Sequence, residues 1–162
     1  MADEHTKLRL ALGLAKRGLY IAPLRPCTKL PYADESWSHM RTRDPNVITA
    51  WFRERPNMNY AVIGGEEFVV LDLDTKKGKN GPAALESSAL DVEDYSDAIK
   101  ETFIVTTPSK GEHRYFKCDF PVSNAHTFGR MSGIDIRGND GYVVGPGCYT
   151  DEDRANNTVE GE

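Results

Sequence analysis

Two carboxylates follow an apolar run in the stretch FVVLDLD, residues 68–74. Side chains alternate across a β-strand, so Asp72 and Asp74 point to one face of it and Leu71 and Leu73 to the other. Two carboxylates this close repel each other, and burial raises the free-energy cost of keeping both ionised. A divalent cation such as Mg²⁺ removes the repulsion, because it binds carboxylate oxygen. The alternative is an ordinary strand end, with Asp74 opening a solvated turn.

A second polar cluster lies in the segment VTTPSKGEHRYF, residues 105–116. A strand runs into a Pro-Ser-Lys-Gly turn, and the chain returns as a second strand that carries His113. The turn amides, Ser109 and Lys110 together offer donors and positive charge for an anion such as a phosphate. An ordinary hairpin, whose histidine is satisfied by a neighbour, is the alternative.

A third cluster lies in GIDIRGNDGYVVGPG, residues 133–147. Alternation places Asp135 and Arg137 on one face of a strand and Ile134 and Ile136 on the other. Asp135 is thus a third carboxylate at a strand position, with a cation two residues away. A surface ion pair, which adds little to stability, explains the same pattern.

Composition narrows the classes of protein. The 162 residues fit one domain, and the formal net charge of −5 argues against a generic basic nucleic-acid binder. No apolar run approaches the roughly 20 residues of a membrane span. The three cysteines, Cys27, Cys118 and Cys148, form no C-x-x-C pair, so the sequence indicates neither a zinc site nor a disulfide framework. We therefore expect a protein of the reducing cytoplasm, without a membrane segment.

The elements that must position these clusters begin with a helix whose apolar residues recur over 8–15 and which stops at Gly18. A strand is expected over 19–24 and a loop over 25–45. Asp44-Pro45 is a helix-start signal, and that helix ends before Pro56. A strand over 60–63 then turns at Gly64-Gly65 into the acidic strand, which predicts a hairpin.

Residues 77–101 are expected to form a loop, a short helix and an acidic linker. Strand signals follow in quick succession, over 102–107, 113–117, 134–137 and 142–144. Helices followed by a strand-rich half predict an α+β domain with a largely antiparallel or mixed sheet. We expect this domain to span residues 1–150, with an acidic tail over 151–162.

The order of the three clusters is more specific than any one of them. The sequence reads h-D-h-D at a strand end, then T-P-S-x-G-x-H-x-Y-F, then G-h-D-h-R-G, where h is an apolar residue. This order resembles the archaeo-eukaryotic primase superfamily, most closely the bifunctional primase–polymerase (prim-pol) domains of phages, plasmids and their bacterial relatives. The segments KRGLYIAPLRPCTKLPYADESW and WFRERPNMNYAVIGGEEFVVLDLD extend the resemblance upstream, to about residues 10–150 in all.

The resemblance implies a metal site. Asp72 and Asp74 match the first family motif and Asp135 the third, and these three catalytic carboxylates would hold two Mg²⁺ or Mn²⁺ ions. The implied fold is a helix-containing N-terminal unit packed on an RRM-like unit, with the active site in the cleft between them. The chain ends at Val-Glu-Gly-Glu, where relatives continue into another strand, so we expect it to be cut from a longer protein.

The resemblance also implies a nucleotide site. Ser109 and His113 match the second motif, in which the histidine contacts the phosphates of the incoming nucleotide. Arg137 and Lys29 match positions expected to contact the triphosphate or the template. Lys110 departs from the family, which often has glycine there. Either that backbone position tolerates a side chain or Lys110 adds a phosphate contact.

The implied activity is that of a DNA primase/DNA polymerase, a template-directed nucleotidyltransferase that makes primers, extends them, or both. Its partners would be a single-stranded or primed DNA template, dNTPs or NTPs, and a helicase domain or protein outside this chain. The setting would be the cytoplasm of a bacterial or phage-infected cell. The loop residues Lys29, Arg41 and Arg43 are the best candidates for a template track.

Two other functions remain open from the residues. A metal-dependent nuclease is one, since Asp72-x-Asp74-x-Lys76 loosely resembles the D/E-x-K pattern of restriction-type nucleases. That interpretation gives the cluster around His113 no role. A non-catalytic domain that binds nucleic acid or nucleotide within a replication initiator is the other. The presence of all three acids and the histidine argues against it.

Overall fold

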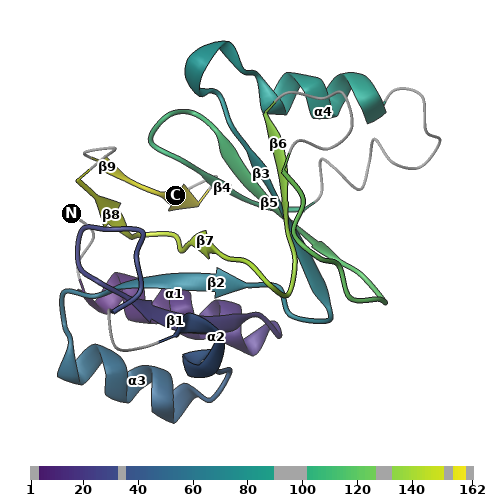
Figure 1. Ribbon diagram of the computed structural model, residues 1–162. Coiled ribbons are helices and arrows are strands. Elements are labelled where there is room, and N and C mark those ends of the chain that lie inside the picture. The colour runs from purple at the N-terminus through teal and green to yellow at the C-terminus, as the bar shows by residue number, and fades with distance from the viewer. Residues whose placement is uncertain (1–3, 33–35, 90–101, 127–132, 152–154, 160–162) are drawn as a thin grey trace.

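The computed structural model describes residues 4–32, 36–89, 102–126, 133–151 and 155–159. Within these ranges the chain forms two main antiparallel sheets, and the helices all lie before residue 90 (Figure 1). The helices are α1 (Glu4–Lys16), α2 (Trp37–Met40), α3 (Pro45–Glu54) and α4 (Gly81–Ala89), with a 3₁₀ turn η1 (Lys76–Gly78). None of the helices in these described ranges is long and apolar enough to cross a membrane.

The N-terminal unit is a three-stranded sheet with α1, α2 and α3. Its strands are ordered β1 (Tyr20–Leu24), β2 (Asn59–Ile63) and β7 (Val143–Val144). Helix α1 packs on β1, β2 and α3. As expected, α1 ends before Gly18, whose φ of +105° suits glycine, and α3 begins after Asp44, whose carboxylate accepts a hydrogen bond from the Asn46 amide at 2.8 Å.

The second unit is a five-stranded sheet, ordered β10-β4-β5-β3-β6, in which every neighbouring pair is antiparallel. The strands are β3 (Phe68–Leu73), β4 (Phe103–Thr106), β5 (Glu112–Lys117), β6 (Ile134–Arg137) and β10 (Thr158–Val159). Helix α4 follows β3 and covers one face of the sheet, where Leu85 packs with Leu71, Leu73 and Ile134. The α+β class and the RRM-like unit, with its strand order β4-β5-β3-β6, are confirmed.

The opposite face of this sheet packs against the N-terminal unit. Val70, Val105 and Tyr115 belong to the same buried cluster as Phe52 and Tyr60 of the N-terminal unit. The alternation within β3 therefore separates two apolar environments, with leucines under α4 and Val70 in the main core. Because both units contribute to one core, they are held as one body.

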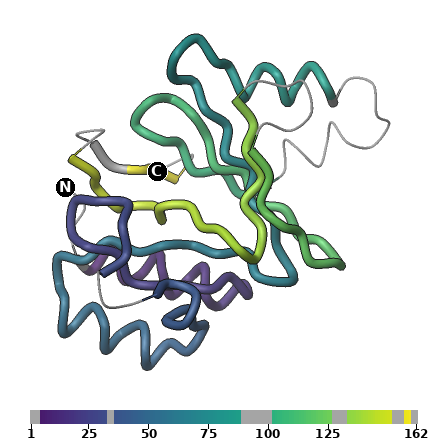
Figure 2. The backbone as a smooth tube through the Cα atoms, viewed as in Figure 1, coloured from purple at the N-terminus to yellow at the C-terminus, as the bar shows by residue number. Residues whose placement is uncertain are grey.

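The chain crosses between the two main sheets three times, and Figure 2 shows the path of its backbone. It leaves the first sheet after β2 and returns to it as β7. The hairpin predicted at Gly64-Gly65 is therefore wrong, since β2 and β3 belong to different sheets. A Cβ at Gly64 would lie 2.0 Å from the Phe68 carbonyl oxygen, and Gly65 has a φ of +67°. The two glycines allow a sharp bend, and a bend between sheets leaves the same sequence signal as a hairpin.

Two further features lie outside the sequence expectations. The loop predicted over 25–45 contains the short helix α2. Within the expected tail over 151–162, β9 (Ala155–Asn156) pairs with β8 (Tyr149–Thr150), and β10 extends the second sheet at β4. The expected acidic linker before residue 102 lies outside the described residues.

Candidate active site

Strand register brings the motif residues together. Asp72 lies on β3, directly opposite His113 on β5 and directly opposite Asp135 on β6. Because β3 lies between β5 and β6, its side chain at this position has one neighbour on each side. Asp72 and His113 are 41 positions apart in sequence, and His113 and Asp135 are 22 positions apart. The strand pairing places all three in one row across the sheet, on the face opposite α4.

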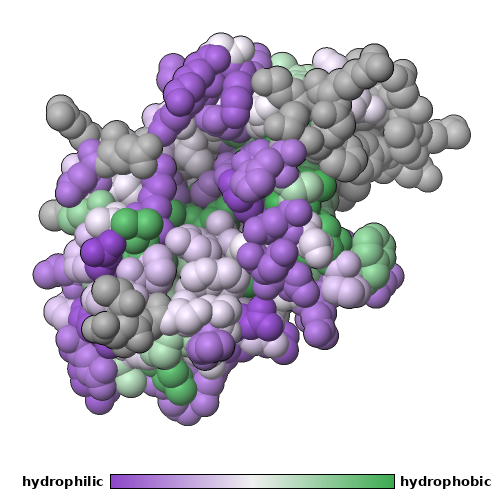
Figure 3. All heavy atoms as spheres, viewed as in Figure 1, coloured by the Kyte–Doolittle hydropathy of each residue, from purple (hydrophilic) through white to green (hydrophobic). Residues whose placement is uncertain are grey.

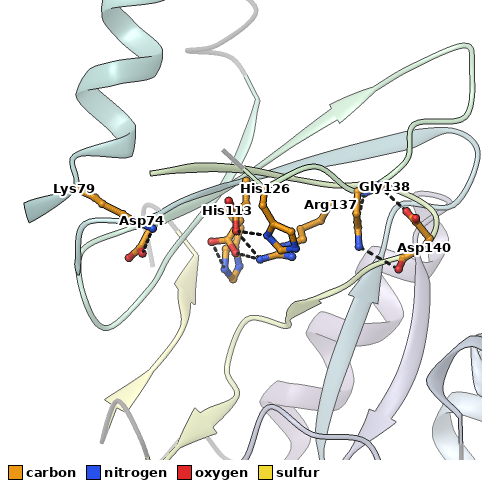
Figure 4. A network of polar contacts seen from close by, with 10 residues as sticks. Asp74, Lys79, His113, His126, Arg137, Gly138 and Asp140 are labelled. Atoms are coloured by element: carbon orange, nitrogen blue, oxygen red, sulfur yellow. Dashed lines mark hydrogen bonds and ion pairs between the residues drawn. The ribbon is translucent and has the colours of Figure 1, made fainter. Parts of the chain in front are cut away.

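Arg137 lies between the two carboxylates of this row. Its Nη2 atom is 2.9 Å from Asp135 Oδ2 and 3.4 Å from Asp72 Oδ2 (Figure 4). Arg137 is two residues beyond Asp135 on β6 and so shares its face. One guanidinium therefore offsets the repulsion between two neighbouring carboxylates. The same Asp135 oxygen also has a second neighbour, the exposed His126, whose Nδ1 atom lies 3.2 Å from it.

His113 is the most enclosed polar residue of the row, with an exposed fraction of 6%. Its Nε2 atom is 3.7 Å from Asp72 Oδ1, and its buried Nδ1 has no hydrogen-bond partner among the described residues. Burial lowers the pKa of His113 below the usual 6.5, against the pull of Asp72 and with the help of the charges on Lys29 and Arg137. The imidazole is therefore neutral at neutral pH.

The turn between β4 and β5 is closed by its own backbone. The Thr107 amide donates to the Gly111 carbonyl at 2.8 Å, and the Lys110 amide donates to the Thr107 carbonyl at 2.9 Å. The Thr107 and Ser109 hydroxyls lie 3.2 Å apart, and the Thr75 hydroxyl donates to the Ser109 carbonyl. Lys110 has a φ of +65°, which explains the glycine that the family often has here.

Asp74 has a different environment from Asp72. Its Oδ1 atom accepts a hydrogen bond from the Lys76 amide at 2.9 Å, and its Oδ2 atom is 3.5 Å from Lys79 Nζ. Figure 4 shows Asp74 and Lys79 apart from the group around Arg137. Among the described residues, no group of three or more Asp, Glu, His or Cys is arranged to hold a metal ion.

A cavity of about 480 Å³ runs along these residues. Its walls come from both units: the loop after β1, the ends of β3 and β6, the β4–β5 turn and β7. Over the loop that contains η1, hydrophilic side chains gather on the surface (Figure 3). Seven of the eight site residues predicted from the sequence line the cavity: Lys29, Asp72, Asp74, Ser109, His113, Asp135 and Arg137.

Lys110 is the predicted site residue that does not line the cavity, and it is exposed. Of the three residues proposed for a template track, only Lys29 lines it. Arg41 and Arg43 instead stack on the ring of Tyr20, at 5.1 and 4.4 Å from its centroid. These two arginines therefore have intramolecular partners on the N-terminal unit.

Although Lys76 appeared in the nuclease interpretation, four residues of the site were not among the predicted site residues: Lys76, Thr107, Tyr142 and His126. The first three line the cavity, and His126 contacts Asp135. Lys76 and Thr107 adjoin the quoted motifs, so proximity in sequence was a usable signal. Tyr142 lies within the quoted segment 133–147, so it too was near a motif in sequence, whereas His126 lies outside the quoted segments and is brought to Asp135 by the fold.

A comparison with protein families identifies the chain. The family described as bifunctional DNA primase/polymerase, N-terminal (Prim-Pol), matches residues 11–162. The chain belongs to the Prim-Pol family. This confirms the resemblance drawn from the motifs and indicates DNA primase/polymerase activity, with DNA and nucleotides as substrates. A search of curated proteins found no match to the Prim-Pol chain.

Proposed function

We propose that this Prim-Pol domain is a template-directed nucleotidyltransferase that makes or extends DNA primers from (d)NTPs with two divalent cations. The observation that carries the proposal is the row of Asp72, His113 and Asp135 across three neighbouring strands, on the wall of a cavity. A carboxylate pair beside a buried, neutral histidine provides metal ligands and a nucleotide contact in one place.

The donor type fits Mg²⁺ or Mn²⁺, which prefer carboxylate oxygen, although the described residues do not gather three such ligands around one point. Asp72 and Asp135 both direct Oδ2 to one positive group, Arg137, so this place already accommodates a cationic partner. Asp74, the third ligand, is held by a partly exposed pair with Lys79, and such pairs contribute little. When bound, two such cations would activate the attacking 3′-hydroxyl and stabilise the leaving pyrophosphate.

The remaining polar residues of the cavity suit a triphosphate. Ser109 offers a hydroxyl at the β4–β5 turn, and Lys29 and Arg137 supply positive charge from the two units. His113 has a buried ring nitrogen without a partner among the described residues, which a bound nucleotide would satisfy. These groups bind and orient the nucleotide, and such positioning is a large part of the catalysis of phosphoryl transfer.

The test is extension of a primed DNA template with Mg²⁺ or Mn²⁺ and either dNTPs or NTPs. Asp72→Asn and Asp135→Asn should each lower the rate of nucleotide addition by about 100-fold or more, because the metal's contribution amounts to several kcal/mol. The matched control is Asp119→Asn, a change at an exposed carboxylate just after β5, which should extend as the wild type does. Circular dichroism checks that each variant is folded.

Two outcomes would favour the alternatives. Metal-dependent loss of template strands without added nucleotide, abolished by the same substitutions, would indicate the nuclease. Binding of template or nucleotide without any incorporation would indicate a non-catalytic domain.

The wider setting is also part of the proposal. A helicase acting on the same template, and the cytoplasm of a bacterial or phage-infected cell, are supported by the family resemblance alone. Co-purification of the chain with replication proteins from such cells tests both.

A further inference from the structure

The loop that carries Lys29 onto the cavity wall is closed on itself. Its ends are joined by the Arg25 amide, which donates to the Leu30 carbonyl at 2.9 Å. The Thr28 hydroxyl donates to the Arg25 carbonyl at 3.1 Å, and the Leu30 amide donates to that hydroxyl at 3.2 Å. This loop, residues 25–30, is therefore a compact turn whose orientation depends on what anchors it.

Two consecutive carbonyls of the loop are anchored by side chains, one from the residue just before β7 and one from β2. The Tyr142 hydroxyl donates to the Lys29 carbonyl at 2.7 Å. Asn59 Nδ2 donates to the Thr28 carbonyl at 2.9 Å and also to the Tyr149 carbonyl at 2.6 Å. A third anchor is the Asp151 amide, which donates to the Cys27 carbonyl at 2.9 Å.

The side chains that anchor the loop are themselves held in place. Asn59 has an exposed fraction of 1%, and both of its amide hydrogen bonds go to backbone carbonyls. Tyr142 lies on the cavity wall, with its ring edge-on to Trp37 at 5.4 Å between centroids. The buried Asn59 amide and the Tyr142 ring packed on Trp37 are well suited to hold a backbone in place, because packing restricts both side chains.

One of the anchored carbonyls belongs to Lys29, the residue whose charge reaches the site. Lys29 lines the same cavity as His113 and Arg137, and its charge helps to lower the pKa of His113. Tyr142 follows β6, the strand of Arg137, along the chain. A single hydroxyl thus ties the lysine loop of the N-terminal unit to the segment that leaves the carboxylate row.

We infer that Tyr142 and Asn59 are positioning residues that hold Lys29 over the cavity, where its ammonium group binds the polyphosphate of the incoming nucleotide. The inference rests on the proposed function. It predicts that loss of the Tyr142 hydroxyl weakens nucleotide binding through Lys29, although the phenol itself need not touch the nucleotide. Asn59 is inside the core, so Tyr142 is the cleaner position to test.

The experiment compares Tyr142→Phe with Tyr60→Phe. Both changes remove one tyrosine hydroxyl that donates to a backbone carbonyl, since Tyr60 donates to the Pro146 carbonyl at 2.8 Å inside the core. Tyr142→Phe should raise the KM for dNTP about fivefold with kcat nearly unchanged, the size expected for one lost hydrogen bond. Tyr60→Phe should leave KM unchanged. The dissociation constant of dNTP, measured by calorimetry, should follow KM.

The decisive comparison repeats the Tyr142→Phe substitution in a protein that already carries Lys29→Met. If Tyr142 acts through Lys29, adding Tyr142→Phe to Lys29→Met should weaken dNTP binding no further. A full additional fivefold loss in the double variant would overturn the inference, and so would unchanged dNTP affinity in Tyr142→Phe alone.

Hydrogen exchange separates this inference from the proposed function. The Arg25 and Leu30 amides should exchange faster in Tyr142→Phe than in Tyr60→Phe, whether or not the protein adds nucleotides. Equal exchange would overturn the positioning role. Wild-type protein that binds dNTP but adds none would overturn the proposed function and leave the exchange and calorimetry results to decide on Tyr142.

Discussion

At the scale of single residues, His113 combines burial with a location between opposing charges. Desolvation disfavours its protonated form, while Asp72 favours it and Lys29 and Arg137 disfavour it. The net effect is a pKa below 6.5 in the folded protein. An unfolded chain has no such environment, so its histidine binds a proton at a higher pH.

This difference predicts that acid destabilises the fold through His113. The pKa of His113 is lower in the folded protein than in the unfolded chain. The stability that depends on its neutral imidazole is therefore fully present above about pH 6.5 and is lost as the pH falls below that value. The free energy of unfolding should fall by up to about 1.4 kcal/mol per pH unit in this window. Urea unfolding at pH 7.5, 6.5 and 5.5 measures it.

His113→Gln should flatten this pH dependence, while His39→Gln, a change at an exposed histidine of α2, should keep it. Equal slopes in wild type and His113→Gln would show that the titration of His113 is not coupled to folding. The range stays above pH 5, where most carboxylates remain ionised.

At the scale of elements, the β4–β5 turn contains a residue in a costly conformation. Lys110 adopts a left-handed backbone, which costs a side chain with a Cβ roughly 1–2 kcal/mol relative to glycine. Its backbone amide closes the turn, whereas its side chain is exposed and off the cavity wall. The position thus constrains the backbone and leaves the side chain without a role in the cavity.

Replacing Lys110 tests this interpretation. Lys110→Gly should raise the free energy of unfolding by up to about 1 kcal/mol, because the strain is relieved. Lys110→Val should lower it by about 1 kcal/mol or more, because a β-branched residue fits this region least well. Denaturant unfolding measures both. If glycine destabilises the protein, the turn is not strained at Lys110.

The elements also show what the sequence reveals and what it does not. Period-two alternation predicted which faces Asp72, Asp135 and Arg137 share, and capping signals predicted α3, because both depend on local geometry. The partners of β2 are not local, since β7 comes from a segment some 80 residues later. Gly64-Gly65 therefore looked like a hairpin. Tyr142 lies within the quoted segment 133–147, but its place on the cavity wall depends on the pairing of the adjacent β7 with β2, so it was not predicted as a site residue.

At the scale of the whole molecule, two arginines of the N-terminal unit contact two of the segments that cross between the sheets. Arg41 Nη1 donates to the Asn139 carbonyl at 3.0 Å, in the segment that returns to β7. Arg43 Nη1 lies 3.7 Å from Glu67 Oε2, in the segment that leaves β2. Both guanidinium groups also stack on Tyr20, so one ring holds the two arginines that contact these crossings.

These contacts differ in strength because they differ in exposure. Arg41→Met should lower the free energy of unfolding by about 1.5 kcal/mol or more, since its bond to Asn139 is partly buried and charge-assisted. Arg43→Met should cost less than about 1 kcal/mol, because its ion pair is exposed. Urea unfolding measures both, and we expect a single transition because the units share one core. Equal losses would contradict this ranking.

The place of β7 has a consequence for how the molecule is made. Protein synthesis proceeds from the N-terminus, so β1 and β2 leave the ribosome while β7 is still to be translated. Until then the edge of β2 opposite β1 has backbone amides and carbonyls without their final partners. Pairing over so long a separation in sequence is slow to form. The nascent chain therefore carries an open sheet edge until residue 144 has emerged.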